Sequence, residues 1–256
     1  MSEQLTDAQQ AAVEHFEGPL MVLAGPGSGK TRVITQRIAR LLERGVGADQ
    51  ILAMTFTNKA AREMADRVDR LVGGRRVFVS TFHRFCSRLL RTYPDEVGLK
   101  NNFTILDVQD QVRVVRDLMK ESGFSTTSHD PRRVLNCISR FRNHLITAEQ
   151  FERQFEERPG GPLETIVYNV FGCYERALVN QNAVDFDSLL LHTVQMLSHN
   201  ETLREDLDDQ FRFLLVDEYQ DTNLAQYRII TALSQRYPNL CTTGDPDQSI
   251  YGWRGA

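Results

Sequence analysis

A glycine-rich loop that ends in lysine and threonine lies near the start of the chain. It reads Gly25-Pro-Gly-Ser-Gly-Lys30-Thr31, with an apolar run before it and helical periodicity after it, which is the context of a phosphate-binding loop. Glycines let the backbone curl so that successive N–H groups point at phosphate oxygens, and the following helix N-terminus adds a favourable dipole. Lys30 would neutralise the outer phosphates and the Thr31 hydroxyl would bind Mg²⁺. The pattern therefore favours a site for ATP and magnesium over a chance glycine-rich turn.

An acidic pair offers the other groups that hydrolysis of a triphosphate needs. Asp217 and Glu218 directly follow the apolar run Phe213-Leu-Leu-Val216. In a parallel sheet the carboxyl ends of the strands line one crevice, so we expect this pair to lie beside the phosphate loop. Asp217 would hold Mg²⁺ through its water shell, and Glu218 would take the proton from the attacking water. Taken alone, the pair could equally be solvated or cap a helix, and the phosphate loop favours the functional interpretation.

Five apolar runs that end in small or polar residues predict the strands that position these groups. They lie at residues 19–25, 51–56, 77–82, 211–218 and 239–245. Helical periodicity fills the gaps between the first three runs, and Gly45 and Gly73 are expected as C-caps. This alternation of strand and helix predicts a doubly wound α/β domain with buried parallel strands.

Between about residues 100 and 185 the apolar pattern changes to helices alone. Thr147 with Gln150 predicts a capping box at the start of one helix, and Pro159-Gly-Gly-Pro162 breaks the run. We interpret the apolar stripes of these helices as core packing. The chain is therefore divided into a first part of the α/β domain at 1–99, a helical inserted subdomain at 100–185 and a second part of the α/β domain at 186–256.

Composition restricts the class of protein. With 41% hydrophobic and 25% charged residues, the chain has the balance of an ordinary globular protein. Its 4 cysteines are scattered without metal-ligand spacing, which fits a reduced cytosolic compartment. The N-terminus is too polar for a signal peptide, and no apolar run approaches the roughly 18 residues of a membrane helix. We expect a cytoplasmic protein with no membrane partner, and the net charge of -4 confines any DNA contact to a few side chains.

Five segments together resemble, in their usual order, the motifs of UvrD/Rep/PcrA-type superfamily 1 DNA helicases. They are Lys30-Thr31, Thr55-Phe-Thr-Asn-Lys-Ala-Ala61, Ser80-Thr-Phe-His83, Val216-Asp-Glu-Tyr-Gln-Asp-Thr222 and Gly244-Asp-Pro-Asp-Gln-Ser-Ile-Tyr-Gly-Trp-Arg-Gly-Ala256. The resemblance spans the chain and implies an N-terminal fragment of such a helicase. The implied fold is a P-loop NTPase with a RecA-like parallel sheet flanked by helices, carrying an all-helical inserted subdomain.

The resemblance also implies roles for individual residues at the nucleotide. Gln9 matches the glutamine that reads the adenine edge, which suits an amide able to donate and accept hydrogen bonds. Gln248 matches a sensor of the terminal phosphate, Arg254 an arginine that reaches that phosphate, and Arg32 would assist. The implied nucleotide-binding residues are Gln9, Gly25, Gly27, Ser28, Gly29, Lys30, Thr31 and Arg32. The implied catalytic residues are Lys30, Asp217, Glu218, Gln248 and Arg254, with Thr31 and Asp217 at the metal.

A second set of residues matches positions that contact DNA in this family. Phe56, Tyr251 and Trp253 would stack on bases, because every base offers a π surface to an aromatic ring. Phe56 taken alone would be interpreted as a core aromatic. The residues expected to contact the DNA backbone are Thr55, Asn58, Lys59, Thr81 and His83. A satisfied buried histidine is the alternative for His83.

The function that the resemblance implies is ATP-dependent 3′–5′ translocation on single-stranded DNA, with unwinding at single/double-strand junctions in repair or replication. A second lobe would supply further arginines to the ATP site. Since no later motif follows Ala256, we expect feeble hydrolysis and no unwinding by this chain alone, because losing such arginines costs on the order of 10³ to 10⁵ in rate. The alternatives are a nucleotide- or DNA-binding module that does no work, and a P-loop kinase, which would leave the segment from Gln248 to Arg254 without a role.

Overall fold

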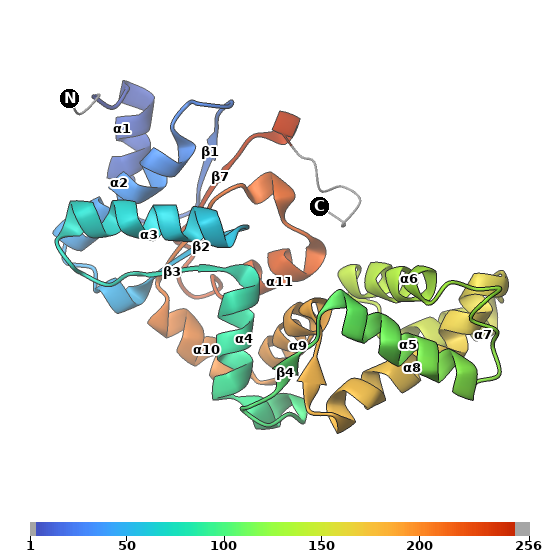
Figure 1. The fold of residues 1–256 in the computed structure, drawn as a ribbon. Helices are drawn as coiled ribbons and strands as arrows, with labels where there is room; N and C mark the ends of the chain where they lie inside the picture. The colour runs from blue at the N-terminus through green and yellow to red at the C-terminus, as the bar shows by residue number, and fades with distance from the viewer. Residues whose placement is uncertain (1–3, 249–256) are drawn as a thin grey trace. The chain divides into compact units, whose positions relative to one another are not determined.

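The computed structural model describes residues 4–248, which fall into two compact units (Figure 1). The first unit contains residues 4–85 and 197–248, and the second contains residues 86–196. The chain leaves the first unit within helix α4 (Phe82–Thr92) and returns within helix α9 (Phe186–His199). The domain limits expected at 99/100 and 185/186 stay a prediction, because this division follows compactness alone.

The first unit is built on a five-stranded sheet in which all neighbouring strands run parallel. The strand order is β1-β7-β6-β2-β3. The strands are β1 (Leu20–Leu23), β2 (Ile51–Thr55), β3 (Phe78–Thr81), β6 (Phe213–Val216) and β7 (Leu240–Gly244). Each predicted apolar run contains one of these strands, so the predicted parallel α/β fold is confirmed. Because the strands are parallel, their carboxyl ends all lie along one edge of the sheet, which we call the carboxyl edge.

Helices cover the sheet and bury its apolar strands. The helices of this unit are α1 (Asp7–Glu14), α2 (Lys30–Glu43), α3 (Asn58–Val72), α10 (Glu201–Gln210) and α11 (Leu224–Ala232), with the short 3₁₀ segments η1 (Ala48–Gln50), η3 (Tyr219–Asp221) and η4 (Pro246–Gln248). Ile34 and Ile38 of α2 pack with Ala53 of β2, and α3 lies beside α2 (Figure 1). The alternate strand residues Leu52 and Met54 point to the opposite face and are also fully buried. Burial of both faces explains why β2 and β6 are continuous apolar runs, whereas Met21 and Leu23 of the edge strand β1 are exposed.

The two glycines expected at helix ends adopt the left-handed backbone conformation. Gly73 is the C-cap of α3 with φ 65°, and its N–H donates to the Asp69 carbonyl. Gly45, with φ 90°, directly follows Arg44, the C-cap of α2. Other residues pay about 1–2 kcal/mol for this conformation, so both helices end where the sequence indicates.

The second unit is mainly helical. It contains α5 (Val108–Glu121), α6 (Pro131–Asn143), α7 (Ala148–Glu157), α8 (Pro162–Asn180) and the 3₁₀ segment η2 (Pro94–Val97), together with parts of α4 and α9. Val115, Ile138 and Phe171 are among the fully buried residues of its core. The predicted capping box of Thr147 and Gln150 is present at the start of α7. Among the described residues, no helix is long and apolar enough to cross a membrane.

One feature of the second unit differs from the expectation of helices alone. A two-stranded parallel sheet joins β4 (Thr104–Ile105) to β5 (Ala183–Val184), near the two ends of the helical segment. Strands of two residues are too short to show an alternating apolar pattern, so no sequence pattern predicts them. This pair brings together parts of the chain about eighty residues apart.

A buried ionic cluster lies next to β5 and is called the Asp185 cluster. Asp185 accepts hydrogen bonds at Oδ2 from Arg142 (2.7 Å) and from the Tyr174 hydroxyl (2.8 Å), and at Oδ1 from the Ser188 N–H (2.7 Å). Glu175 lies 3.5 Å from Arg142 as a second acidic partner. The cluster joins α6, α8 and the start of α9, and its cation and both carboxylates belong to the second unit.

Candidate functional site

The glycine-rich loop connects β1 to α2 at the carboxyl edge. Gly27 and Gly29 have φ of 71° and 88°, a left-handed conformation that favours glycine. The hydroxyl of Ser28 donates to the Gly25 carbonyl at 2.7 Å and closes the turn. Gly29 is the N-cap of α2 and provides no side-chain hydrogen bond. The first N–H groups of α2, which have no acceptors within the helix, therefore form a suitable donor set for an anion.

Lys30 lies within the curl of this loop. Its Nζ donates to the carbonyls of Ala24 (2.8 Å) and Gly25 (3.3 Å), and the residue is 8% exposed. The loop carbonyls thus hold a buried ammonium group next to the N-terminus of α2. A positive charge and converging N–H donors at one place suit the outer phosphates of a nucleotide.

Asp217 connects the loop to the middle of the sheet. Its Oδ2 accepts a hydrogen bond from the Thr31 hydroxyl at 3.0 Å, and its Oδ1 accepts from the Thr243 hydroxyl at 2.6 Å and from the Glu218 N–H at 3.1 Å. Burial raises the pKa of Asp217, although the two threonine hydrogen bonds act in the opposite direction. All three of these hydrogen-bond donors are neutral, so none of them compensates the charge of the buried carboxylate.

The donor set around Asp217 fits magnesium. Mg²⁺ prefers oxygen ligands and is usually bound by one or two carboxylates or hydroxyls together with substrate phosphates and water. The Thr31 hydroxyl and the Asp217 carboxylate are such oxygens, and they lie 3.0 Å apart. Among residues 4–248, no group of three or more His, Cys, Asp or Glu side chains could hold a metal by itself. The residues present therefore suit an ion that arrives with phosphate.

Glu218 adopts an uncommon backbone conformation directly after β6. Its φ of 55° places a non-glycine residue in the left-handed region, and Gln220 donates from Nε2 to its Oε2 at 2.8 Å. The Oε1 atom of Gln220 accepts from the Asp245 N–H at 3.1 Å. A Cβ atom added to Gly244 would lie 2.9 Å from Gln220 Oε1, so a larger residue at this position would displace the Gln220 amide. The Gln220 amide thereby joins the segments that follow β6 and β7.

Gln248 lies in η4, just beyond the end of β7. Its Nε2 donates to Asp245 Oδ2, and its backbone N–H donates to the Asp245 carbonyl at 3.0 Å. Since β1, β7 and β6 are neighbours in the sheet, the Lys30 loop, the acidic pair and the Gln248 segment share one stretch of the carboxyl edge. The structure thus brings together the three groups that the sequence analysis expected to meet.

Gln9 reaches the same loop from α1. Its Nε2 donates to the Ser28 carbonyl at 2.8 Å, and its Oε1 accepts from the Thr6 N–H in a capping box. A Cβ atom on Gly29 would lie 3.1 Å from Gln9 Nε2, which shows how closely the two segments pack. Arg32 is half-buried in the first turn of α2. Arg254 lies outside the described residues.

The residues expected at DNA follow the neighbouring strands along the same edge. Thr55, the last residue of β2, is 1% exposed, and its buried hydroxyl has no hydrogen-bond partner. The half-buried ring of Phe56 meets Phe82 edge-on, with centroids 5.8 Å apart. Asn58 and Lys59 are exposed at the start of α3, where Lys59 Nζ lies 3.9 Å from Glu63. The set therefore contains both buried and exposed members.

Thr81 is the last residue of β3, the next strand along the edge, and His83 lies two residues further on. Thr81 is buried, and its hydroxyl accepts from the Arg84 N–H at 3.3 Å. His83 is half-buried in the first turn of α4. Tyr251 and Trp253 lie outside the described residues. The DNA contacts of the whole set stay predictions.

Two residues that contact the acidic pair were not predicted from the sequence. Thr243 holds Asp217 from β7, and Gln220 joins Glu218 to the segment after β7. Thr243 could have been found because its hydroxyl lies at the end of a predicted strand, Leu240-Cys-Thr-Thr-Gly244. For Gln220 the sequence offers only its place two residues after the acidic pair.

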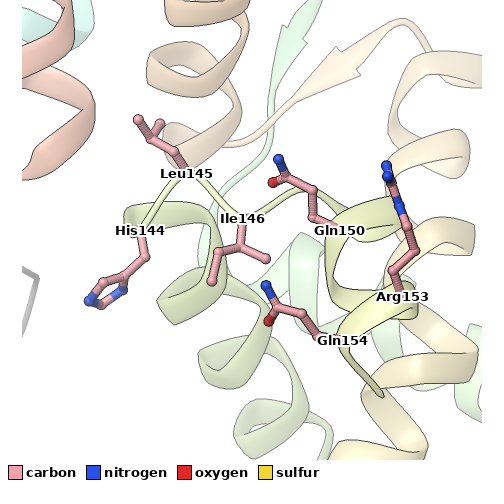
Figure 2. Close-up of a pocket in the computed structure, with 6 residues that line it drawn as sticks. All are labelled: His144, Leu145, Ile146, Gln150, Arg153 and Gln154. Atoms are coloured by element: carbon pink, nitrogen blue, oxygen red, sulfur yellow. The ribbon is translucent and has the colours of Figure 1, made fainter. Parts of the chain in front are cut away.

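A pocket of about 410 Å³ lies in the second unit, between the end of α6 and α7 (Figure 2). Leu145 and Ile146 border it on one side, and Gln150, Arg153 and Gln154 project from α7 on the other (Figure 2). It contains none of the residues predicted for nucleotide, metal or DNA. The predicted residues that the structure describes therefore lie outside this pocket.

Comparison with known proteins gives a consistent result. Residues 5–256 match the family described as the UvrD/REP helicase N-terminal domain. The chain is 43% identical over 255 residues to ATP-dependent DNA helicase PcrA of Bacillus subtilis (strain 168), covering 98% of this chain and 34% of the relative. It is also 43% identical over 251 residues to the protein of that name from Staphylococcus aureus (strain Mu50 / ATCC 700699), covering 97% and 34%. The chain thus spans about a third of the length of these curated relatives.

Proposed function

The chain belongs to the UvrD/REP helicase N-terminal domain family, and on that premise we propose that it is the ATP-binding lobe of an ATP-dependent DNA helicase. The proposal covers 3′–5′ translocation on single-stranded DNA and action at single/double-strand junctions in repair or replication. It includes a cytoplasmic location and a second lobe that completes the ATP site. Support comes from the relatives, which are named ATP-dependent DNA helicases.

The observation that carries the proposal is the hydrogen-bonded connection through Asp217. One carboxylate accepts from Thr31, which follows the phosphate loop, and from Thr243 on β7. A chance glycine-rich turn would have no reason to meet an acidic residue 186 positions away in the chain at 3.0 Å. The contact supports a common pocket for triphosphate and magnesium.

In the proposed mechanism the chain's own residues bind the nucleotide and prepare the attacking water. Lys30 and the first N–H groups of α2 bind and orient the outer phosphates. Thr31 and Asp217 would hold Mg²⁺, which supplies charge neutralisation at the phosphates when bound. Gln248 orients the terminal phosphate and its attacking water, and Arg254 reaches the same phosphate.

Glu218 accepts the proton of the attacking water in this proposal. The hydrogen bond from Gln220 fixes one of its carboxylate oxygens, which leaves the other to face the water. Gln9 reads the adenine edge, and its contact with Ser28 supports a position next to the phosphate loop. Arg32 adds positive charge at the start of α2.

The DNA side of the proposal uses the neighbouring strands β2 and β3. Phe56, Tyr251 and Trp253 stack on bases, while Thr55, Asn58, Lys59, Thr81 and His83 contact the DNA backbone. The Asp217 N–H donates to the carbonyl of Met54, the residue before Thr55, at 2.9 Å. A shift of Asp217 on nucleotide binding would reach the DNA side through this hydrogen bond and through the pairing of β6 with β2.

The test is a titration of the 256-residue chain with a fluorescent single-stranded oligonucleotide, with and without magnesium and a nonhydrolysable ATP analogue. We expect the analogue to bind and to change the DNA affinity, and Lys30→Ala to remove that change. DNA affinity that ignores the nucleotide would contradict a motor lobe and favour a simple binding module. Failure of the analogue to bind would contradict the nucleotide site itself.

A further inference from the structure

Helix α1 is too short to hold its own position. It has 8 residues, whereas isolated helices shorter than about 12–15 residues are marginal in water. Its first turn carries Gln9, whose amide lies against the phosphate loop. The position of Gln9 therefore depends on what fastens α1 to the rest of the first unit.

A buried arginine of α2 holds the far end of α1. Arg37 is 1% exposed, and its NH1 donates to the carbonyl of Ala12 at 3.1 Å and to that of His15. Its NH2 donates to the Phe16 carbonyl at 3.2 Å. The last carbonyls of a helix receive no hydrogen bond from N–H donors within the helix, so one guanidinium supplies donors that these carbonyls would otherwise lack.

Helix α1 lies beside α2 (Figure 1). The other side-chain contacts between the two helices are exposed or nonpolar. Ala12 and Val13 pack on Val33 in a small apolar cluster. Arg40 and Arg44 reach Glu14, but all three side chains are about a third exposed, and exposed ion pairs contribute little. The guanidinium of Arg37 is therefore the buried polar attachment at the C-terminal end of this helix, as the Gln9 amide is the attachment at its N-terminal end.

We propose that Arg37 is a positioning residue for recognition of the nucleotide base, acting through α1 on Gln9. The inference rests on the proposed function, in which Gln9 reads adenine. The loop that binds the phosphates connects β1 directly to α2, and α1 meets it through the hydrogen bond from Gln9 to the Ser28 carbonyl, so its fold rests mainly on β1 and α2. Loss of the Arg37 contacts should therefore weaken selection of the base and leave phosphate binding intact.

The test compares the dissociation constants of ATP, GTP and inorganic tripolyphosphate for the 256-residue chain. We expect Arg37→Met to reduce the preference for ATP over GTP by about threefold to tenfold, the worth of one hydrogen bond. Affinity for tripolyphosphate should stay within about twofold, which also reports that the loop is folded. Arg75→Met is the matched control, since Arg75 donates to the Leu42 carbonyl at the end of α2 and not to α1.

A double variant separates the possible outcomes. If Arg37 acts through Gln9, Arg37→Met should have no further effect on the ATP preference in a Gln9→Ala background. The inference would be overturned, and the proposed function left standing, by either of two results. One is an unchanged ATP preference in Arg37→Met. The other is a double variant whose loss of ATP preference equals the sum of the losses in the two single variants. An unchanged preference in Gln9→Ala would overturn the role of Gln9 and the inference with it. If Arg37→Met does not fold, the same ratio of ATP to GTP affinity is measured in Arg37→Lys and Arg37→Gln, which each keep one hydrogen-bond donor group.

Discussion

Two buried aspartates, one in each unit, accept the same number of hydrogen bonds from different partners. Asp185 in the second unit accepts from Arg142, the Tyr174 hydroxyl and a backbone N–H. Asp217 in the first unit accepts from the hydroxyls of Thr31 and Thr243 and from a backbone N–H. One set includes a cation and the other consists of neutral groups.

The pKa values of the two carboxyl groups shift in opposite directions for this reason. Burial acts to raise the pKa of Asp185, but the charge of Arg142 and hydrogen bonds from Ser188 and Tyr174 outweigh it, so the pKa is lowered. Burial raises the pKa of Asp217, and its threonine hydrogen bonds do not compensate. The negative charge of Asp185 is thus compensated by a cation of its own chain. The described partners of Asp217 are neutral, and Mg²⁺ bound with a nucleotide would compensate its charge.

The largest expected effect is the loss of folding stability when Asp185 is neutralised. Asp185→Asn would leave Arg142 with a weakened set of acidic partners in the core, and breaking a buried pair typically costs about 3–5 kcal/mol. Urea unfolding followed by circular dichroism measures this loss. Asp209→Asn is the matched control, because its pair with Arg236 is about half exposed and should contribute little. A loss below about 1 kcal/mol for Asp185→Asn would contradict the structural assignment.

The next effect concerns ligand affinity at the carboxyl edge. Lys30→Ala removes the buried ammonium group, and hydrogen bonds to charged groups contribute about 1.5–3 kcal/mol. We expect the affinity for the magnesium complex of ATP to fall by about tenfold to a hundredfold in a fluorescence titration. Lys100→Ala, an exposed lysine of the second unit, serves as control. Equal affinities for the two variants would contradict a phosphate site at the loop.

The smallest effect has the opposite sign to the first. Asp217→Asn removes a buried carboxylate that burial disfavours, so without nucleotide or magnesium it should stabilise the chain by about 0.5–2 kcal/mol at pH 7.5. A carboxyl with a raised folded pKa contributes stability below its unfolded value of about 3.9 and loses it as pH rises through the folded value. The advantage of the variant should therefore shrink as the pH is lowered toward 4. If Asp217→Asn destabilised the chain as much as Asp185→Asn, the proposed difference between the two aspartates would be wrong.

The sequence predicts the carboxyl-edge site well because its signals are local. A glycine pattern before Lys30 and an acidic pair after an apolar run each identify a strand end, and parallel strands bring such ends to one edge. The caps at Gly73 and Thr147 are likewise local features of helix ends. Each of these predictions needs only neighbouring residues.

The remaining contacts depend on pairing between distant segments. Sequence alone does not tell whether Thr242 or Thr243 faces Asp217, because that choice depends on the register between β7 and β6. The pairing of Arg142 with Asp185 spans 43 positions and requires three helices to be placed first. The roles expected of Tyr251, Trp253 and Arg254 lie outside the described residues and stay predictions.

The most direct test of the central claim is how much magnesium strengthens nucleotide binding. Affinity for a nonhydrolysable ATP analogue should be measured with Mg²⁺ and with EDTA, in the unmodified chain and in Asp217→Asn. We predict that magnesium tightens binding to the unmodified chain, and that Asp217→Asn weakens the magnesium-dependent part by about 10- to 100-fold while binding in EDTA is unchanged. An equal magnesium effect in both proteins would contradict a common pocket of Lys30, Asp217 and Gln248.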